Sequence, residues 1–222
     1  MRIFAYVLIG LAAAATVLSL IGLGVDLDIA RLFFDPAAGR FAAYPALAML
    51  RDHGYVSIAT GTGFLIAALA ARLLPQLRLS IPGRAVIFLA GSLALGPGLL
   101  VNVVFKDHWH RPRPVQVVEF GGGKAYVDWW NPTGACETNC SFASGETASA
   151  AWMAAPAMLA PAPWRAAALV AVAIFTATIS LSRMSVGAHF FTDVVFGALM
   201  AMLAVWAMYA LMYDRRRTGG ES

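Results

Sequence analysis

Long apolar stretches without a charged residue recur along this chain, separated by more polar segments. Six such stretches lie at residues 3–25, 54–71, 85–105, 147–164, 166–182 and 194–213. Each has roughly 17–25 residues, the length with which a helix crosses the hydrocarbon core of a membrane. The pattern therefore predicts an all-α protein, a bundle of six transmembrane helices that forms one integral membrane domain over residues 1–222.

Composition agrees with a membrane protein. Of the 222 residues, 60% are hydrophobic and 13% are charged, which is too apolar for an ordinary soluble domain. The first stretch follows Arg2 and contains small residues at 12–15, as a signal peptide does. Because its apolar region exceeds the roughly 7–15 residues of a cleavable signal, we expect an uncleaved anchor.

The positions of Lys and Arg favour both termini on the cytoplasmic side. With that orientation, the inner segments carry Arg2, Arg72, Arg78, Arg84, Arg165 and residues 215–217. The outer segments carry the same number of cations, but they are longer, and three of their cations belong to a candidate site. The net charge of +4 reflects this topology, so we expect no binding to nucleic acid.

Polar and charged residues gather in three segments at the ends of predicted helices, at 106–114, 143–146 and 182–193. A phosphate monoester carries close to two negative charges. An enzyme that transfers it without a metal needs fixed cations, backbone donors, a nucleophile and a proton source. Lys106, Arg113 and Arg183 can supply the cations. Each of them alone is also typical of a charge that anchors a helix end at the membrane surface.

A histidine and a carboxylate stand four residues apart in the third segment. His189 and Asp193 share a face at the start of the last predicted helix, so the carboxylate can fix the imidazole tautomer and support a positive charge on the ring. A structural pair that caps the helix is the alternative. In the second segment, Ser144, Gly145 and Glu146 begin a helix whose free N–H groups can face an anion.

The two cysteines lie in the long polar segment that precedes Ser144. Cys136 and Cys140 fall outside the cytoplasm in the predicted topology, and a pair at this spacing can close a disulfide in an oxidising compartment. Two free thiols are the alternative. A zinc site would need further ligands, and none are spaced nearby, so we expect no metal.

These residues resemble the tripartite signature of the type 2 phosphatidic acid phosphatase superfamily. The match consists of Lys106, six residues, then Arg113-Pro114; Ser144-Gly145; and Ser182-Arg183, five residues, His189, three residues and Asp193. The resemblance implies a phosphatase without metal or cofactor, in which His189 becomes a phosphohistidine and Asp193 orients it. The resemblance also implies which groups bind the phosphate oxygens. These are Lys106, Arg113, Arg183, Ser144 and the backbone N–H of Gly145.

The second motif departs from the family pattern. The family has Pro-Ser-Gly-His there, and this chain has Ala143-Ser144-Gly145-Glu146. The missing histidine usually protonates the leaving group, and three hypotheses follow. Glu146 is itself the general acid, with a pKa raised by burial; or the leaving group is a phosphate that needs little protonation; or the protein is a catalytically weak relative.

The predicted function is a phosphatase of an envelope lipid. Its site would face the periplasm or exterior from the inner (cytoplasmic) membrane, and lipid A phosphate is favoured by family resemblance. Undecaprenyl pyrophosphate and phosphatidylglycerophosphate are alternative substrates. A lipid phosphotransferase, and a non-catalytic protein that binds lipid phosphates, are alternative functions. Partners would be the lipid phosphate substrate and membrane lipids, and the sequence makes no prediction of oligomeric state.

Overall fold

The computed structural model describes two main segments, residues 24–41 and 82–214, together with residues 13, 16, 17, 59, 61, 63, 66 and 67. The predicted spans at 3–25 and 54–71 therefore lie outside the described residues, apart from these positions.

The described part is mostly helical, which confirms the all-α class. Its helices are α2 (Val25–Arg31), α5 (Gly83–Leu93), η2 (Ala94–Phe105), α6 (Lys106–His108), η3 (Pro114–Gln116), η4 (Val118–Phe120), α7 (Gly145–Trp152), α8 (Ala154–Leu159), α9 (Ala162–Ser185), α10 (Phe191–Tyr209) and η5 (Ala210–Asp214). Strands β1 (Phe34–Asp35) and β2 (Arg40–Phe41) pair antiparallel in a small hairpin.

Three helices in the described part are long and apolar enough to cross a membrane. They run over Gly83–His108, Ala162–Ser185 and Phe191–Tyr213, and they contain the predicted spans at 85–105, 166–182 and 194–213. The first of them combines α5, η2 and α6. Its π-helical stretch η2 contains Pro97, whose missing N–H disturbs the regular helical ladder. The protein is therefore a membrane protein.

The predicted span at 147–164 is not one continuous helix. It is divided into α7 and α8 at Met153, and α8 ends at Leu159, before Pro161 and Pro163. Pro156 has no N–H to donate to the carbonyl of Trp152, which explains the break between the two helices. Within the described part of the chain, this segment is not one of the helices long enough to cross a membrane on its own, so the prediction of six spans is not confirmed here.

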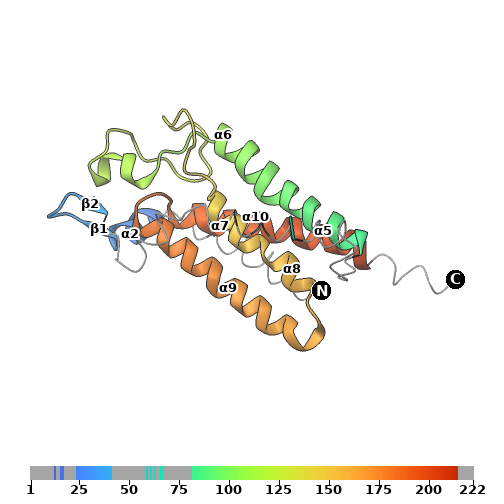
Figure 1. The fold of residues 1–222 in the computed structure, drawn as a ribbon. Helices are drawn as coiled ribbons and strands as arrows, with labels where there is room; N and C mark the ends of the chain where they lie inside the picture. Colours follow the sequence, from blue (N-terminus) through green and yellow to red (C-terminus); the bar gives the residue numbers. More distant parts are fainter. Residues whose placement is uncertain are drawn as a thin grey trace.

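The helix α10 lies at the centre of the described bundle and packs against α7, η2 and α5 (Figure 1). The core between them contains Phe88, Val101, Phe142, Trp152 and Val205. A Cβ added at Gly197 would lie 2.6 Å from the carbonyl oxygen of Ser144, so only glycine lets α10 approach the start of α7 this closely. This contact brings the second and third sequence motifs together.

Candidate active site

The three motif segments meet at one end of the bundle. α6 ends there, α7 and α10 begin there, and α9 reaches it with its last turn, next to α2 and the β1–β2 hairpin (Figure 1). The connection between His108 and Ser144 covers the same end. Residues about 80 positions apart are therefore close in space; Arg111, for instance, donates a hydrogen bond to Asp193.

His189 lies two residues before the start of α10 and is almost fully buried, with 1% of its surface exposed. Its Nδ1 lies 2.7 Å from the carbonyl oxygen of Ser141. Because a carbonyl oxygen only accepts hydrogen bonds, Nδ1 must carry the proton, and Nε2 of the neutral ring keeps its lone pair. Asp193 Oδ2 lies 3.8 Å from Nδ1, beyond hydrogen-bond distance. The tautomer is thus set by Ser141.

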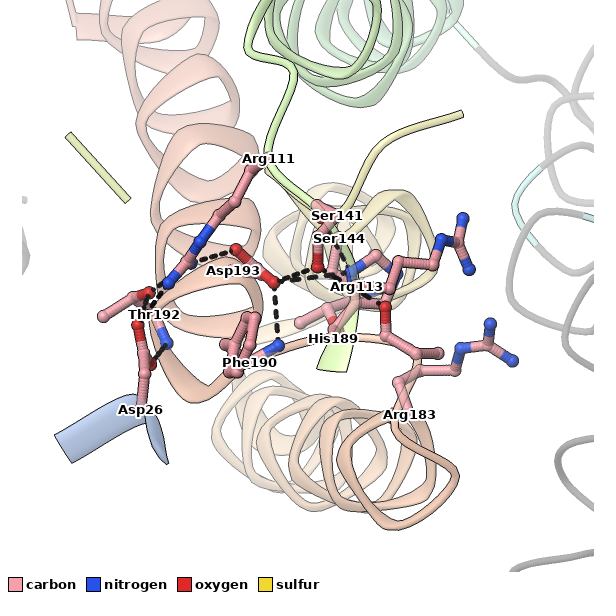
Figure 2. Close-up of polar contacts among 12 residues, drawn as sticks. Asp26, Arg111, Arg113, Ser141, Ser144, Arg183, His189, Phe190, Thr192 and Asp193 are labelled. Atoms are coloured by element: carbon pink, nitrogen blue, oxygen red, sulfur yellow. Dashed lines mark hydrogen bonds and ion pairs between the residues drawn. The ribbon is translucent and has the colours of Figure 1, made fainter. Parts of the chain in front are cut away.

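Asp193 is held by other groups around the same point. Its Oδ2 accepts hydrogen bonds from the Ser141 hydroxyl and, at 2.7 Å, from the backbone N–H of Phe190. Its Oδ1 lies 2.6 Å from Arg111. Ser141 therefore connects the carboxylate to the histidine, since its carbonyl binds His189 and its hydroxyl binds Asp193 (Figure 2).

Glu146 lies against the Nε2 side of the His189 ring. Its Oε2 is 3.6 Å from His189 Nε2, and its Oε1 is 3.4 Å from an Arg183 nitrogen. Among the described residues, His189 Nε2, Glu146 Oε2 and Arg183 Nε are buried and have no hydrogen-bond partner. Buried polar atoms rarely stay unpaired, so this convergence marks a place where a polar ligand would bind.

The electrostatics of Glu146 contradict one hypothesis from the sequence. Burial acts to raise its pKa, but His189, Arg183 and Lys106 outweigh burial and hold the pKa of Glu146 below its usual range. These neighbours therefore favour the ionised form of Glu146. Burial acts in the direction that the sequence hypothesis assumed, but the groups around the carboxyl outweigh it, so the pKa is not raised.

The other cations lie around the same carboxylate. Arg113 donates to the carbonyl oxygen of Asn139 from Nε at 3.2 Å and from a terminal nitrogen at 2.9 Å, which fixes its direction. Burial lowers the pKa of Arg113, and Glu146 opposes that shift. Lys106, partly buried at the start of α6, interacts electrostatically with Glu146 as well. Figure 2 shows Arg113 and Arg183 extending to the same side, away from Asp26.

Ser144 and Gly145 form the N-terminus of α7. The Ser144 hydroxyl accepts from the backbone N–H of Thr147 at 3.4 Å and donates to its side chain at 3.0 Å, so it caps the helix. The backbone N–H of Ser144 donates to the carbonyl of Asp193 at 3.0 Å. A Cβ on Gly145 would lie 2.8 Å from the side-chain oxygen of Asn102, so a larger residue here would require that side chain to move.

A disulfide joins Cys136 and Cys140, with 5.7 Å between their Cα atoms. The segment it closes is fastened to the first motif, because the Cys136 N–H donates to His110 at 3.0 Å. The backbone N–H of Ser141 likewise donates a hydrogen bond to the backbone carbonyl of Arg111 at 2.9 Å. The closed segment contains Asn139, the partner of Arg113, and leads directly into Ser141.

Sequence reasoning missed a set of buried polar residues behind Asp193. These are Asp26, Arg111, Ser141 and Thr192, each with 4% or less of its surface exposed. Only Arg111 offered a signal, as a second arginine within the first motif. No three His, Cys, Asp or Glu side chains gather into a metal site within the described part of the chain.

Comparison with known proteins identifies the family. A family model described as the PAP2 superfamily matches residues 85–217, more than half of the chain. This chain therefore belongs to the PAP2 superfamily. No solved structure matches it significantly.

Curated relatives share a common name. The lipid A 4'-phosphatase of Francisella tularensis subsp. novicida is 41% identical over 134 residues, 60% of this chain and 60% of that protein. The lipid A 4'-phosphatase of Rhizobium etli is 43% identical over 121 residues, 54% of this chain and 47% of the relative. The lipid A 4'-phosphatase of Rhizobium leguminosarum is 44% identical over 124 residues, which are 54% of this chain and 52% of that protein. The chain thus spans about half the length of the curated relatives it matches.

Proposed function

We propose that this protein is a lipid phosphatase that removes phosphate from lipid A through a phosphohistidine at His189. The observation that carries the proposal is the buried His189 ring. Its Nδ1 is protonated toward Ser141, and its unpartnered Nε2 faces Glu146, which itself contacts Arg183. The names of the relatives support lipid A as the substrate.

Chemistry at this site proceeds in two displacements. Nε2 of His189 attacks phosphorus, the bond from phosphorus to the sugar oxygen breaks, and the leaving oxygen takes up a proton. Water then attacks the phosphohistidine, inorganic phosphate leaves, and the neutral ring is restored. Lys106, Arg113 and Arg183 stabilise the negative charge on the phosphate oxygens.

Glu146 becomes the proton donor when substrate binds. The phosphate takes over Arg183 and places its own negative charge beside the carboxyl, and both effects favour the protonated form of Glu146. Glu146 therefore takes up a proton from solvent as the substrate binds, and it then delivers this proton to the leaving sugar oxygen.

The ionised state of Glu146 also favours a second candidate substrate. A pyrophosphate-linked lipid such as undecaprenyl pyrophosphate leaves as a phosphate, which needs little protonation, so a carboxylate at this position would not slow its hydrolysis.

The topology proposed with this function is a single domain over residues 1–222 with six transmembrane helices and both termini in the cytoplasm. The motif end would face the periplasm from the inner membrane. Exposed apolar side chains along α9 support its placement in lipid, among them Trp164, Val170 and Ile174.

Phosphate release from purified lipids tests the proposal. Wild type, His189→Ala and Glu146→Gln are compared on lipid A, undecaprenyl pyrophosphate and phosphatidylglycerophosphate, with the exposed His108→Ala as matched control. We expect His189→Ala to lose at least about 1,000-fold in kcat, since the nucleophile is gone. Full activity of His189→Ala would exclude the phosphohistidine.

The Glu146→Gln variant separates the two substrate classes. Loss of activity on lipid A but not on the pyrophosphate supports Glu146 as the donor to a sugar oxygen. Full activity on both rejects that role. Phosphate that appears on a second lipid without free phosphate would indicate a transferase, and tight lipid binding without any release would indicate a binding protein.

A further inference from the structure

Arg111 is enclosed between two carboxylates on the far side of Asp193 from the phosphate cations. One terminal nitrogen lies 2.6 Å from Asp193 Oδ1, and the other lies 2.7 Å from Asp26 Oδ2. The side chains of Arg111 and Asp193 are fully buried, and 4% of the Asp26 side chain is exposed. Figure 2 shows the guanidinium between the two acids.

The rest of the guanidinium is also satisfied. Its Nε donates to the carbonyl of Val127 at 3.0 Å, and the terminal nitrogens donate to Thr192 and Tyr126. Burial acts to lower the pKa of Arg111, but Asp193 and Asp26 outweigh it and raise the pKa above the ordinary arginine value. The arginine is therefore permanently charged in a place where water cannot screen it.

Asp26 comes from a part of the chain outside the family match, which begins at residue 85. The short helix α2 carries it to the start of α10. There its Oδ1 accepts the backbone N–H of Thr192 at 2.8 Å, and its Oδ2 accepts the Thr192 hydroxyl at 2.6 Å. These contacts join α2 to the residue next to Asp193.

The charges in this buried group do not cancel. Two carboxylates and one guanidinium leave one net negative charge. Without Asp26, Arg111 and Asp193 would neutralise each other as a simple ion pair. His189 Nδ1, 3.8 Å from Asp193, would then face a neutral pair at the moment when attack on phosphorus makes its ring positive.

We propose that Asp26 is a positioning residue that neutralises Arg111, so that Asp193 keeps an uncompensated negative charge beside His189. This inference rests on the proposed phosphohistidine chemistry and adds to it a residue from the N-terminal segment. Asp26 acts through Arg111 and Asp193 and does not touch the phosphate.

The test compares kcat and KM for phosphate release from lipid A and from the soluble monoester p-nitrophenyl phosphate. Asp26→Asn keeps the acceptor for the Thr192 N–H and removes one charge. We expect kcat to fall roughly 10–100-fold, the loss typical of removing an outer partner of a functional histidine, with KM unchanged. The matched control is Thr192→Val, which removes hydrogen bonds to Asp26 and Arg111 and keeps all three charges; its kcat loss should be several-fold smaller.

The double variant Asp26→Asn/Arg111→Met restores the net negative charge of the wild type. We expect its kcat to exceed that of Asp26→Asn alone by at least fivefold, a coupling that a purely structural clamp would not produce. Circular dichroism and melting in detergent report whether each variant folds. If the double variant does not fold, the comparison of kcat between Thr192→Val and Asp26→Asn tests the inference on its own.

Each outcome has a defined meaning. Equal losses in Thr192→Val and Asp26→Asn, a folded double variant no better than the single one, or an Asp26→Asn variant as active as wild type would each overturn the inference while the wild type remains active. A wild type that releases no phosphate from either substrate would instead reject the proposed function, and the inference with it.

Discussion

At the scale of single residues, a backbone carbonyl decides which nitrogen of His189 keeps its lone pair when the ring is neutral. The four-residue spacing of His189 and Asp193 predicted direct contact on one helical face. His189, however, precedes the first residue of α10, where helical spacing no longer applies, and the two side chains are 3.8 Å apart. The carbonyl of Ser141 occupies the position expected for the carboxylate.

The charge state of Glu146 gives a pH prediction for stability. Its folded-state pKa lies below the ordinary value of 4.5, so the ionised form stabilises the protein above about pH 4.5. That contribution is lost as the pH falls through the lower folded-state value. Glu146→Gln lacks it. We therefore expect the difference in melting temperature between wild type and Glu146→Gln to narrow as the pH falls below about 4.5.

Thermal unfolding in detergent across this pH range measures the effect. The exposed Glu119→Gln corrects for the general cost of the substitution. A difference that stays constant to pH 3, or widens there, would contradict the depressed pKa.

The contact between Arg111 and Asp26 could not be predicted from the sequence. Their contact joins residues 85 positions apart, and nothing local in either segment indicates it. The cations Arg113 and Arg183 could be found, because a known spacing marks them. The partners behind Asp193 follow only from the docking of α2 on α10.

At the scale of elements, the apolar pattern located three of the described helices well. The helices Gly83–His108, Ala162–Ser185 and Phe191–Tyr213 each exceed the predicted apolar run by several residues. The extra residues include Lys106 and Arg183, which are polar yet helical because the end of a membrane helix reaches the interface. The apolar run at 147–164 instead forms the two shorter helices α7 and α8, which are divided next to Pro156.

From the position of the segment closed by Cys136 and Cys140, we predict that reduction of the disulfide weakens substrate binding. This segment holds Asn139 against Arg113, and it leads into Ser141, the acceptor for His189. We expect Cys136→Ser/Cys140→Ser to raise KM for lipid A about 5- to 20-fold, because a loosened Arg113 grips phosphate less well, and to lower kcat several-fold.

Reductant supplies the internal control. Dithiothreitol should produce the same kinetic change in wild type and no further change in the double serine variant. The disulfide has no such role if mass spectrometry shows both thiols free in treated wild type while KM and kcat remain unchanged.

At the scale of the whole molecule, the residues proposed to bind phosphate lie at one end of the described helices, and the turn between α8 and α9 lies at the other (Figure 1). A lipid headgroup in one leaflet of the membrane can therefore reach His189, Arg183 and Lys106 together. The side of the membrane on which this end lies determines which leaflet supplies the substrate. The orientation of the protein in the membrane therefore limits which lipids it can act on.

Cysteine labelling in right-side-out inner-membrane vesicles tests the proposed orientation. Ala125→Cys lies exposed in the connection before α7, and Ala162→Cys lies exposed at the start of α9, at the opposite end of the bundle. If both termini are cytoplasmic, a membrane-impermeant maleimide should label the first in intact inner-membrane vesicles of right-side-out orientation and the second only after permeabilisation. The native cysteines do not compete, since they are joined in a disulfide. Labelling of Ala162→Cys before Ala125→Cys would reverse the topology and place the site on the cytoplasmic face, where a phosphatase would meet lipids before their export.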